Sequence, residues 1–227
     1  MLITLFLCGT RYDQNSKGEL IADLYKQAGG EIFIFAGAGS DTMSKSDYDP
    51  FSEKRPTGWK NPFSIAKDSV QGRGMDYNVG CLMTYLASLE ADKVTGIPEK
   101  INMVGWSRGA VTCFKMANAI QGKYGAKIEV NIFAIDPVPG PGNFTDDAVR
   151  VPVCVSRCTA IIMENGQSTG FTAARLSLGS NKSTNAKVYP FPGTHGSCVQ
   201  DREGVPNQPR YVIHFLAKNF WRSAGLP

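Results

Sequence analysis

Short segments that are apolar throughout alternate with segments whose apolar residues recur at helical spacing. The expected strands are residues 2–8, 31–37, 100–105 and 128–135, and the expected helices lie around residues 20–25 and over 75–93 and 108–124. Strands without polar residues are buried on both faces, as happens in parallel sheets that helices cover on each side. We therefore predict an α/β fold built on a mostly parallel, doubly wound sheet.

One junction of strand and helix carries a catalytic motif. Residues 105–109 read Gly-Trp-Ser-Arg-Gly, directly after an expected strand and at the start of an expected helix. The small residues at both ends of the motif allow a sharp turn that holds the central serine in a strained conformation with its hydroxyl exposed. This context is typical of the nucleophile elbow of an α/β-hydrolase-like fold, and it predicts Ser107 as the nucleophile.

A serine hydroxyl needs a neighbouring base, which is normally a histidine. The chain holds two histidines. His195 lies in a loop bounded by Gly and Pro late in the chain, where a hydrolase of this order places its base. His214 lies in an amphipathic helix expected over residues 211–221, where a histidine is more often packed or at the surface. We expect His195 to be the base.

The base needs a carboxylate partner that orients the imidazole. Asp136 ends the expected strand 128–135 and precedes a proline, so it should lie at the carboxyl edge of the sheet. The chain order Ser107, Asp136, His195 is the hydrolase order. Asp136 could instead only cap a turn, and the alternative acids are Asp146, Asp147 and Asp201.

Backbone N–H groups are expected to stabilise the oxyanion of acyl transfer. The residue after the nucleophile, Arg108, supplies one donor, and the loop that contains Gly9 and Thr10 follows the first expected strand and is placed to supply another. The alternative for that loop is an ordinary turn. Because they adjoin these groups, the side chains of Trp106 and Arg11 are expected to contact substrate.

Other functions are disfavoured. A net charge of +4 from 24 basic and 20 acidic residues gives no concentrated footprint for nucleic acid, and we find no cluster of Lys and Arg for anionic lipid. The six cysteines are expected to be free and mostly buried, and no zinc spacing is present. The segment 37–40 lacks the rest of a nucleotide-binding motif. No metal or cofactor is expected.

Two segments break the alternation of strands and helices. Residues 40–74 are rich in Ser, Asp, Lys, Pro and Gly, and they are expected to form a partly ordered cap beside the active site. Residues 137–187 are expected to mix core strand, at 151–155 and 160–163, with surface excursions. With 227 residues, of which 42% are hydrophobic, we expect a single domain over residues 1–227. The apolar start is expected to be a strand and not a signal peptide, and no stretch is long enough to span a bilayer.

Several segments together resemble the catalytic domain of bacterial type VI secretion phospholipase effectors and related uncharacterised α/β-hydrolases. They are residues 6–15 (FLCGTRYDQN), 36–42 (AGAGSDT), 104–110 (VGWSRGA), 135–138 (IDPV) and 191–198 (FPGTHGSC). The resemblance implies Ser107 as nucleophile, Asp136 as acid, His195 as base and the Gly9–Thr10 loop near the oxyanion. Departures from the family pattern are Cys8 for an aspartate, Trp106 for a phenylalanine, Pro137 after the acid and Gly-Ser-Cys at 196–198.

The motifs predict a serine ester hydrolase that works through an acyl-enzyme. The resemblance implies a lipase or phospholipase acting on membrane phospholipids, with a membrane surface, an immunity protein and a secretion carrier as partners. It also implies a bacterial effector that is cytoplasmic in its producer and exported by a signal-independent system. Two alternatives stay open: an esterase or thioesterase for small soluble substrates, and an inactive hydrolase fold that serves as a binding module.

Overall fold

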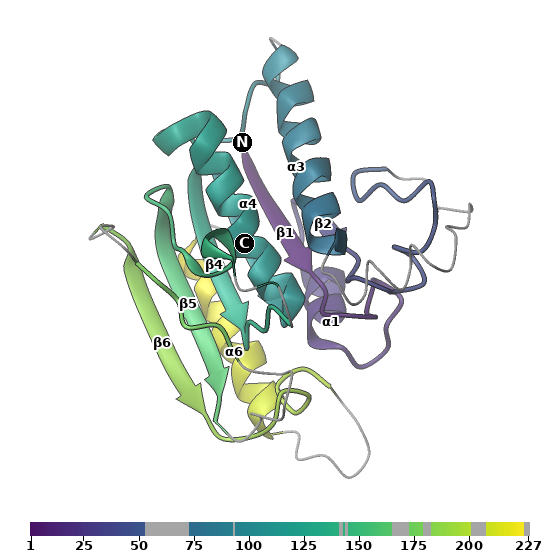
Figure 1. The fold of residues 1–227 in the computed structure, drawn as a ribbon, viewed down its shortest axis with the longest axis vertical. Coiled ribbons are helices and arrows are strands. Elements are labelled where there is room, and N and C mark those ends of the chain that lie inside the picture. The colour runs from purple at the N-terminus through teal and green to yellow at the C-terminus, as the bar shows by residue number, and fades with distance from the viewer. Residues whose placement is uncertain are drawn as a thin grey trace.

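The centre of the molecule is a six-stranded sheet in the order β2-β1-β3-β4-β5-β6, and every neighbouring pair of strands is parallel (Figure 1). The computed structural model describes residues 1–52, 73–92, 94–140, 143, 145–164, 173–178, 183–200 and 208–224. The strands are β1 Leu2–Leu7, β2 Glu31–Phe35, β3 Lys100–Trp106, β4 Glu129–Ile135, β5 Val155–Met163 and β6 Asn185–Phe191.

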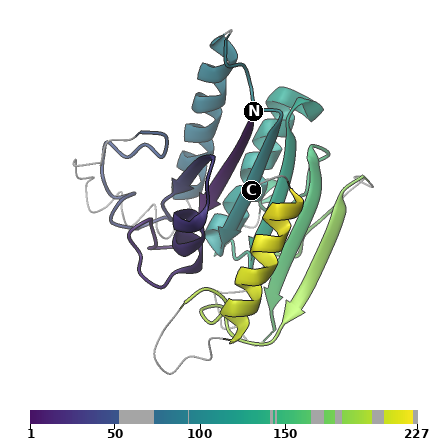
Figure 2. The same cartoon turned by 180° about the vertical axis from the view of Figure 1, so that it is seen from behind.

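Helices cover both faces of this sheet. They are α1 Leu20–Gln27, α3 Arg73–Ala91, α4 Arg108–Tyr124, the short α5 Asp146–Val149 and α6 Gln208–Ser223, with a 3-10 turn at Gly125–Lys127. Helices α3 and α4 lie on one face, and α1 and α6 lie on the other, as the two opposite views show (Figures 1 and 2). The parallel, doubly wound sheet predicted from the sequence is confirmed.

Each face of the sheet has its own buried apolar cluster. Alternate residues of β1 point to opposite faces, so that Leu5 packs with Phe114 of α4 while Phe6 packs with Leu24 of α1 and Trp221 of α6. The strands in the middle of the sheet are therefore buried on both sides, which is why their sequences lack the alternation of a half-exposed strand.

The two irregular segments differ in part from expectation. Residues 155–163 form one continuous strand, β5, whereas residues 151–154, expected to be strand, lie before it. Within 40–74, the described residues 40–52 pack onto β2 and α3: Tyr48 is buried and accepts a hydrogen bond from the Ala36 N–H at 2.8 Å, and the Phe51 ring stacks on Tyr85. Residues 53–72, the greater part of the expected cap, lie outside the described residues.

The topology fixes where a functional site can form. All strands are parallel, so their carboxyl ends share one edge of the sheet. The chain passes from β1 to β2 on one side and later returns to β3 on the other side of β1. In such sheets ligands bind at the carboxyl edge where the strand order reverses, which here lies beside the end of β3.

Candidate active site

Ser107 stands in a strained turn between β3 and α4. Its φ and ψ are 57° and −125°, an unusual conformation for a residue other than glycine. The turn depends on its flanking glycines: a Cβ on Gly109 would lie 2.1 Å from the Leu7 carbonyl oxygen, and one on Gly105 would lie 2.6 Å from the Gly109 carbonyl. The Ser107 N–H donates to the Ile135 carbonyl at 3.0 Å, which anchors the turn to β4.

His195 joins the serine to a carboxylate. Its Nε2 lies 2.9 Å from Ser107 Oγ, and its Nδ1 lies 2.6 Å from Asp136 Oδ2. The other carboxylate oxygen of Asp136 accepts the Met163 N–H at 3.0 Å, which fixes the carboxylate against β5. Both Ser107 and Asp136 are buried. The structure thus brings together the three residues that the sequence predicted as nucleophile, base and acid.

The loop that carries His195 is braced on two sides. Ser197 Oγ accepts the Thr194 N–H at 2.9 Å and donates to the Thr194 carbonyl at 2.8 Å. The Trp106 ring lies nearly parallel to the imidazole, with ring centroids 5.1 Å apart. Tyr12 contacts the same indole edge to face at 5.2 Å. The imidazole therefore has little freedom to rotate away from the serine.

The Trp106 side chain lies beside the imidazole of His195 and not at an open surface. Its side chain was predicted to contact substrate, but it is 3% exposed and fills the space between His195 and the loop after β1. A Cβ on Gly9 would lie 2.3 Å from the indole, so this loop can pack here only because residue 9 is glycine. Burial against the imidazole explains why the elbow holds an aromatic residue before the serine.

The loop after β1 lies close to the start of α4. Within the part of the chain that the structure describes, neither the Gly9 nor the Thr10 N–H donates a hydrogen bond to another protein atom. Arg108 is the first residue of α4, and the N–H groups of a first helical turn have no acceptor within the helix. Donors of this kind are suited to a developing negative charge.

The Arg108 side chain connects this loop to the loop after β4. Its Nη1 donates to Thr10 Oγ1 and its Nε to the Pro139 carbonyl, each at 3.4 Å. Gly140 has a φ of 78°, and a Cβ there would lie 2.5 Å from the guanidinium. Partial burial lowers the pKa of Arg108 below its ordinary value. A glycine in the left-handed region therefore makes room for the guanidinium.

Arg11 lies at the rim of a polar hollow next to this loop. It has a φ of 70°, and its N–H donates to the Ala38 carbonyl at 3.0 Å. The hollow has a volume of about 550 Å³ and is lined by residues of the segments 11–16 and 39–45, among them Asp13 and Lys45. Of the two side chains expected to contact substrate, Arg11 is the one that borders an open space.

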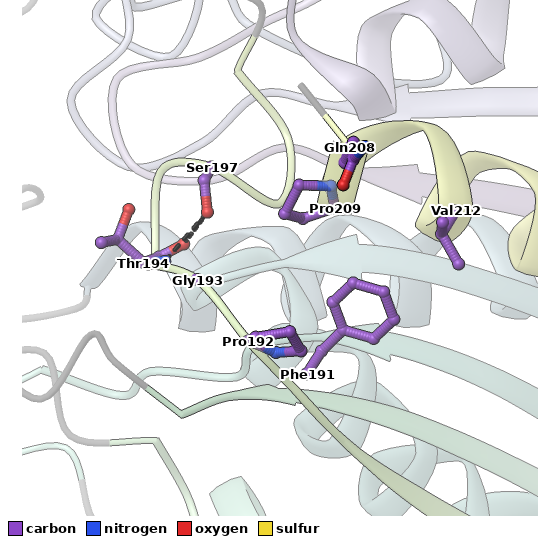
Figure 3. Close-up of a pocket in the computed structure, with 8 residues that line it drawn as sticks. All are labelled: Phe191, Pro192, Gly193, Thr194, Ser197, Gln208, Pro209 and Val212. Atoms are coloured by element: carbon purple, nitrogen blue, oxygen red, sulfur yellow. Dashed lines mark hydrogen bonds between the residues drawn. The ribbon is translucent and has the colours of Figure 1, made fainter. Parts of the chain in front are cut away.

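An apolar hollow lies beside the loop that carries His195. It has a volume of about 470 Å³ and is formed by the end of β6, the loop that follows and the first turns of α6 (Figure 3). Phe191, Pro192, Pro209 and Val212 supply most of its surface, and Gly193, Thr194, Ser197 and Gln208 complete it. This hollow could not be predicted from the sequence, because its walls come from segments that meet only in the fold.

The alternative acids and base lie elsewhere. Asp146 and Asp147 belong to α5, where Asp147 pairs with Lys115 at 3.1 Å, and Asp201 is outside the described residues. His214 lies on α6, and burial together with nearby Lys218 and Arg210 lowers its pKa. Of these candidates, His195 is the histidine that contacts Ser107, and Asp136 is the described aspartate that contacts His195.

The cysteines and the potential metal ligands of the described residues suggest no second reactive site. All six cysteines are free, as predicted, and burial raises the pKa of the Cys198 thiol beside the His195 loop, so that this thiol stays protonated. No cluster of three potential metal ligands occurs among the described residues. Of the described helices, none is both long and apolar enough to cross a bilayer.

Solved structures of other proteins share this architecture. An uncharacterised protein from Pseudomonas aeruginosa superposes with a TM-score of 0.65 at 14% identity, over 100% of this chain and 46% of that one. The Tle1 effector, solved bound to the VgrG spike of the type 6 secretion system, gives a TM-score of 0.52 at 13% identity, over 90% of this chain and 52% of that one. The fold is α/β-hydrolase-like.

The chain spans about half the length of both structures. A protein from Pectobacterium atrosepticum described as a YdeN-like hydrolase gives a TM-score of 0.49 at 12% identity, over 100% of this chain and 94% of that one. Neither a protein-family model nor a curated protein matches the sequence. At these identities the first two similarities show the fold alone.

Proposed function

We propose that this protein is a serine ester hydrolase in which Ser107, His195 and Asp136 form the catalytic triad. The observation that carries the proposal is the chain of contacts from Ser107 Oγ to His195 Nε2 at 2.9 Å and from His195 Nδ1 to Asp136 Oδ2 at 2.6 Å. A proton on Nδ1 that faces the carboxylate leaves Nε2 as the acceptor for the serine proton.

Acylation follows from this arrangement. Ser107 Oγ attacks the carbonyl carbon of the ester while its proton passes to His195 Nε2, and Asp136 stabilises the resulting imidazolium. The N–H groups of Thr10 and Arg108 stabilise the oxyanion of the tetrahedral intermediate. When the bond to the leaving oxygen breaks, that oxygen takes the proton from Nε2 and departs as the alcohol, and the acyl group remains on Ser107.

Deacylation uses the same groups in reverse order. A water molecule attacks the acyl carbon while one of its protons passes to Nε2. Collapse of the second tetrahedral intermediate releases a carboxylic acid and returns the proton to Ser107 Oγ. No cofactor is needed for either half-reaction.

A lipid is the substrate that we favour. The apolar hollow beside the His195 loop offers a site for an acyl chain, because Phe, Pro and Val make up half of the residues that line it. The resemblance to secreted phospholipases points to phospholipid, and the similar structure of an effector bound to a VgrG spike is consistent with a secretion carrier as partner. Under this proposal a cognate immunity protein protects the producing cell.

Two substrates presented in parallel test the proposal. Wild-type protein is expected to release fatty acid from phospholipid vesicles and to cleave a short-chain nitrophenyl ester, and Ser107→Ala is expected to lose both activities by a factor of roughly 10⁴ or more. Cleavage of the soluble ester alone would leave a small-substrate esterase. Failure of folded wild-type protein on both substrates would contradict the proposal and favour an inactive binding module.

A further inference from the structure

Helix α6 presents an uncovered apolar stripe to solvent. Its buried side, which includes Ile213, Ala217 and Trp221, packs on the sheet, whereas Tyr211, Val212 and Phe215 are 59%, 42% and 63% exposed. These three residues lie in the first two turns of the helix, and Val212 lines the apolar hollow (Figure 3). Large apolar side chains that gather at a functional edge in this way mark an interaction surface.

Basic residues recur every four positions beside this stripe. Arg210, His214, Lys218 and Arg222 lie along one side of the helix, and no acidic residue occurs between Gln208 and Ser223. Arg210 is engaged with Asp23 of α1, while Lys218 and Arg222 have no ion pair with the described residues. These residues are separated in the chain and align only on the helix, which is why no cluster of Lys and Arg is evident in the sequence.

The neighbouring edge strand extends the same surface. On β6, Tyr189 is 40% exposed on the side that faces α6. A second hollow of about 290 Å³ between β5, β6 and α6 is lined by Arg157 and Lys187, among other residues. Figure 2 shows α6 on the face of the sheet beside these strands. Apolar and basic groups thus continue from the helix across the edge of the sheet.

We propose that the exposed side of α6, with β6 beside it, docks the protein on an anionic lipid surface. A helix with aromatic residues on one side and cations next to them is suited to the boundary between headgroups and acyl chains. The core of a protein interface, in contrast, is depleted in lysine. The positive charge of α6 favours an anionic partner. The apolar stripe favours a partner with an accessible hydrocarbon layer, as a lipid surface has.

Docking in this orientation would serve the catalytic site. The first turn of α6 and the loop of His195 share the walls of the apolar hollow, so a surface that contacts Tyr211 and Val212 also reaches the residues next to the proposed base. The inference rests on the proposed function for its biological use, because lipid drawn from that surface would enter beside His195. The binding itself does not require catalysis and can be measured without it.

Vesicle binding by a protein that carries Ser107→Ala tests the docking surface. We expect this parent protein to sediment with phosphatidylcholine vesicles that contain phosphatidylglycerol and to bind much more weakly to phosphatidylcholine alone. Adding Lys218→Gln and Arg222→Gln should weaken binding about fivefold for each charge removed. Adding Tyr211→Ser and Phe215→Ser should weaken it roughly tenfold or more.

Matched controls lie away from the surface. Val94 is 94% exposed and Lys127 is also exposed, and Val94→Ser and Lys127→Gln should leave binding unchanged. Circular dichroism of each variant confirms that it is folded. The inference is overturned if the α6 variants bind like the parent, if neutral and anionic vesicles bind equally, or if the controls weaken binding as much as the α6 variants do.

The outcomes also separate docking from catalysis. If the parent binds neither vesicle while the wild type cleaves a soluble ester, the docking surface is wrong and the hydrolase stands. If the parent binds anionic vesicles through α6 while the wild type cleaves nothing, the proposed function fails and the docking surface stands. If the α6 variants change only the self-association of the protein, the surface joins two copies of the chain and the inference is wrong.

Discussion

His195 is held by three side chains that come from two segments, the junction of β3 and α4 and the end of β4. Asp136 orients one ring nitrogen, Ser107 contacts the other, and Trp106 covers one face of the ring. Hydrogen bonds fix the direction of the ring in its own plane, and the indole restricts its tilt. The arrangement is preorganised in the absence of substrate, which is what a general base with little room for reorganisation requires.

Glu19 is a buried carboxyl group whose ionisation should oppose folding. It is fully buried at the start of α1, where Oε2 accepts the Ala22 N–H at 2.8 Å and Oε1 has no partner among the described residues. Burial raises the pKa of Glu19 from 4.5 to about 7. Because the folded pKa lies above the unfolded one, the contribution of Glu19 to stability is complete below about pH 4.5 and is lost as the pH rises through about 7.

This linkage predicts a pH-dependent effect of Glu19→Gln. The variant should match the wild type in stability at about pH 4.5 and exceed it at about pH 8, by up to a few kcal/mol at about 1.4 kcal/mol per pKa unit. Urea unfolding measured across this range tests the prediction. Glu99→Gln, at an exposed position, serves as control. A stability difference that does not change with pH would show that Glu19 is not the group that titrates.

Helix α4 lies in close contact with the sheet at its first turn. Gly109 and Gly122 both belong to this helix, but a Cβ on Gly109 would lie 2.1 Å from the Leu7 carbonyl oxygen, whereas a Cβ on Gly122 meets nothing within 4 Å. Contact between backbones cannot relax through a change of rotamer. Gly109, two residues after Ser107, therefore lets the helix approach β1.

Substitution by alanine is expected to have opposite effects on stability at Gly109 and Gly122. Gly109→Ala should destabilise the protein by roughly 1–3 kcal/mol or more through overpacking, and Gly122→Ala should stabilise it by about 0.5–1 kcal/mol through helix propensity. The free energy of unfolding of each variant in urea measures both effects. Equal effects at the two positions would contradict the packing described for the start of α4.

The sequence predicted the buried elements better than the exposed ones. Helix α4 has the predicted bounds, and β1, β3 and β4 each differ from theirs by one residue, because burial on both faces leaves an apolar run in the chain. Strand β6 begins within the segment 137–187, for which surface excursions were expected; it lies at the edge of the sheet and most of its residues are exposed. Its Lys187 and Asn185 resemble loop residues in sequence.

For the whole molecule, the strand order could not be read from the chain. Ser107 and Asp136 are 29 residues apart in the chain, and Asp136 and His195 are 59 residues apart. Their meeting follows from the parallel sheet, which gathers the ends of β3, β4 and β6 at one edge. The Gly-Trp-Ser-Arg-Gly motif predicted the reactive serine from the sequence. The apolar hollow and the basic side of α6 could be recognised only in the folded structure.

The most direct test of the account is covalent labelling of the wild-type protein by a fluorophosphonate, with the labelled peptide mapped by mass spectrometry. We predict a single phosphonyl group on Ser107, no label in Ser107→Ala, and labelling slowed by roughly 10⁴ in Asp136→Asn, which disturbs the imidazole tautomer. No labelling of folded wild-type protein, or labelling of a different residue, would contradict the claim that Ser107 is an activated nucleophile.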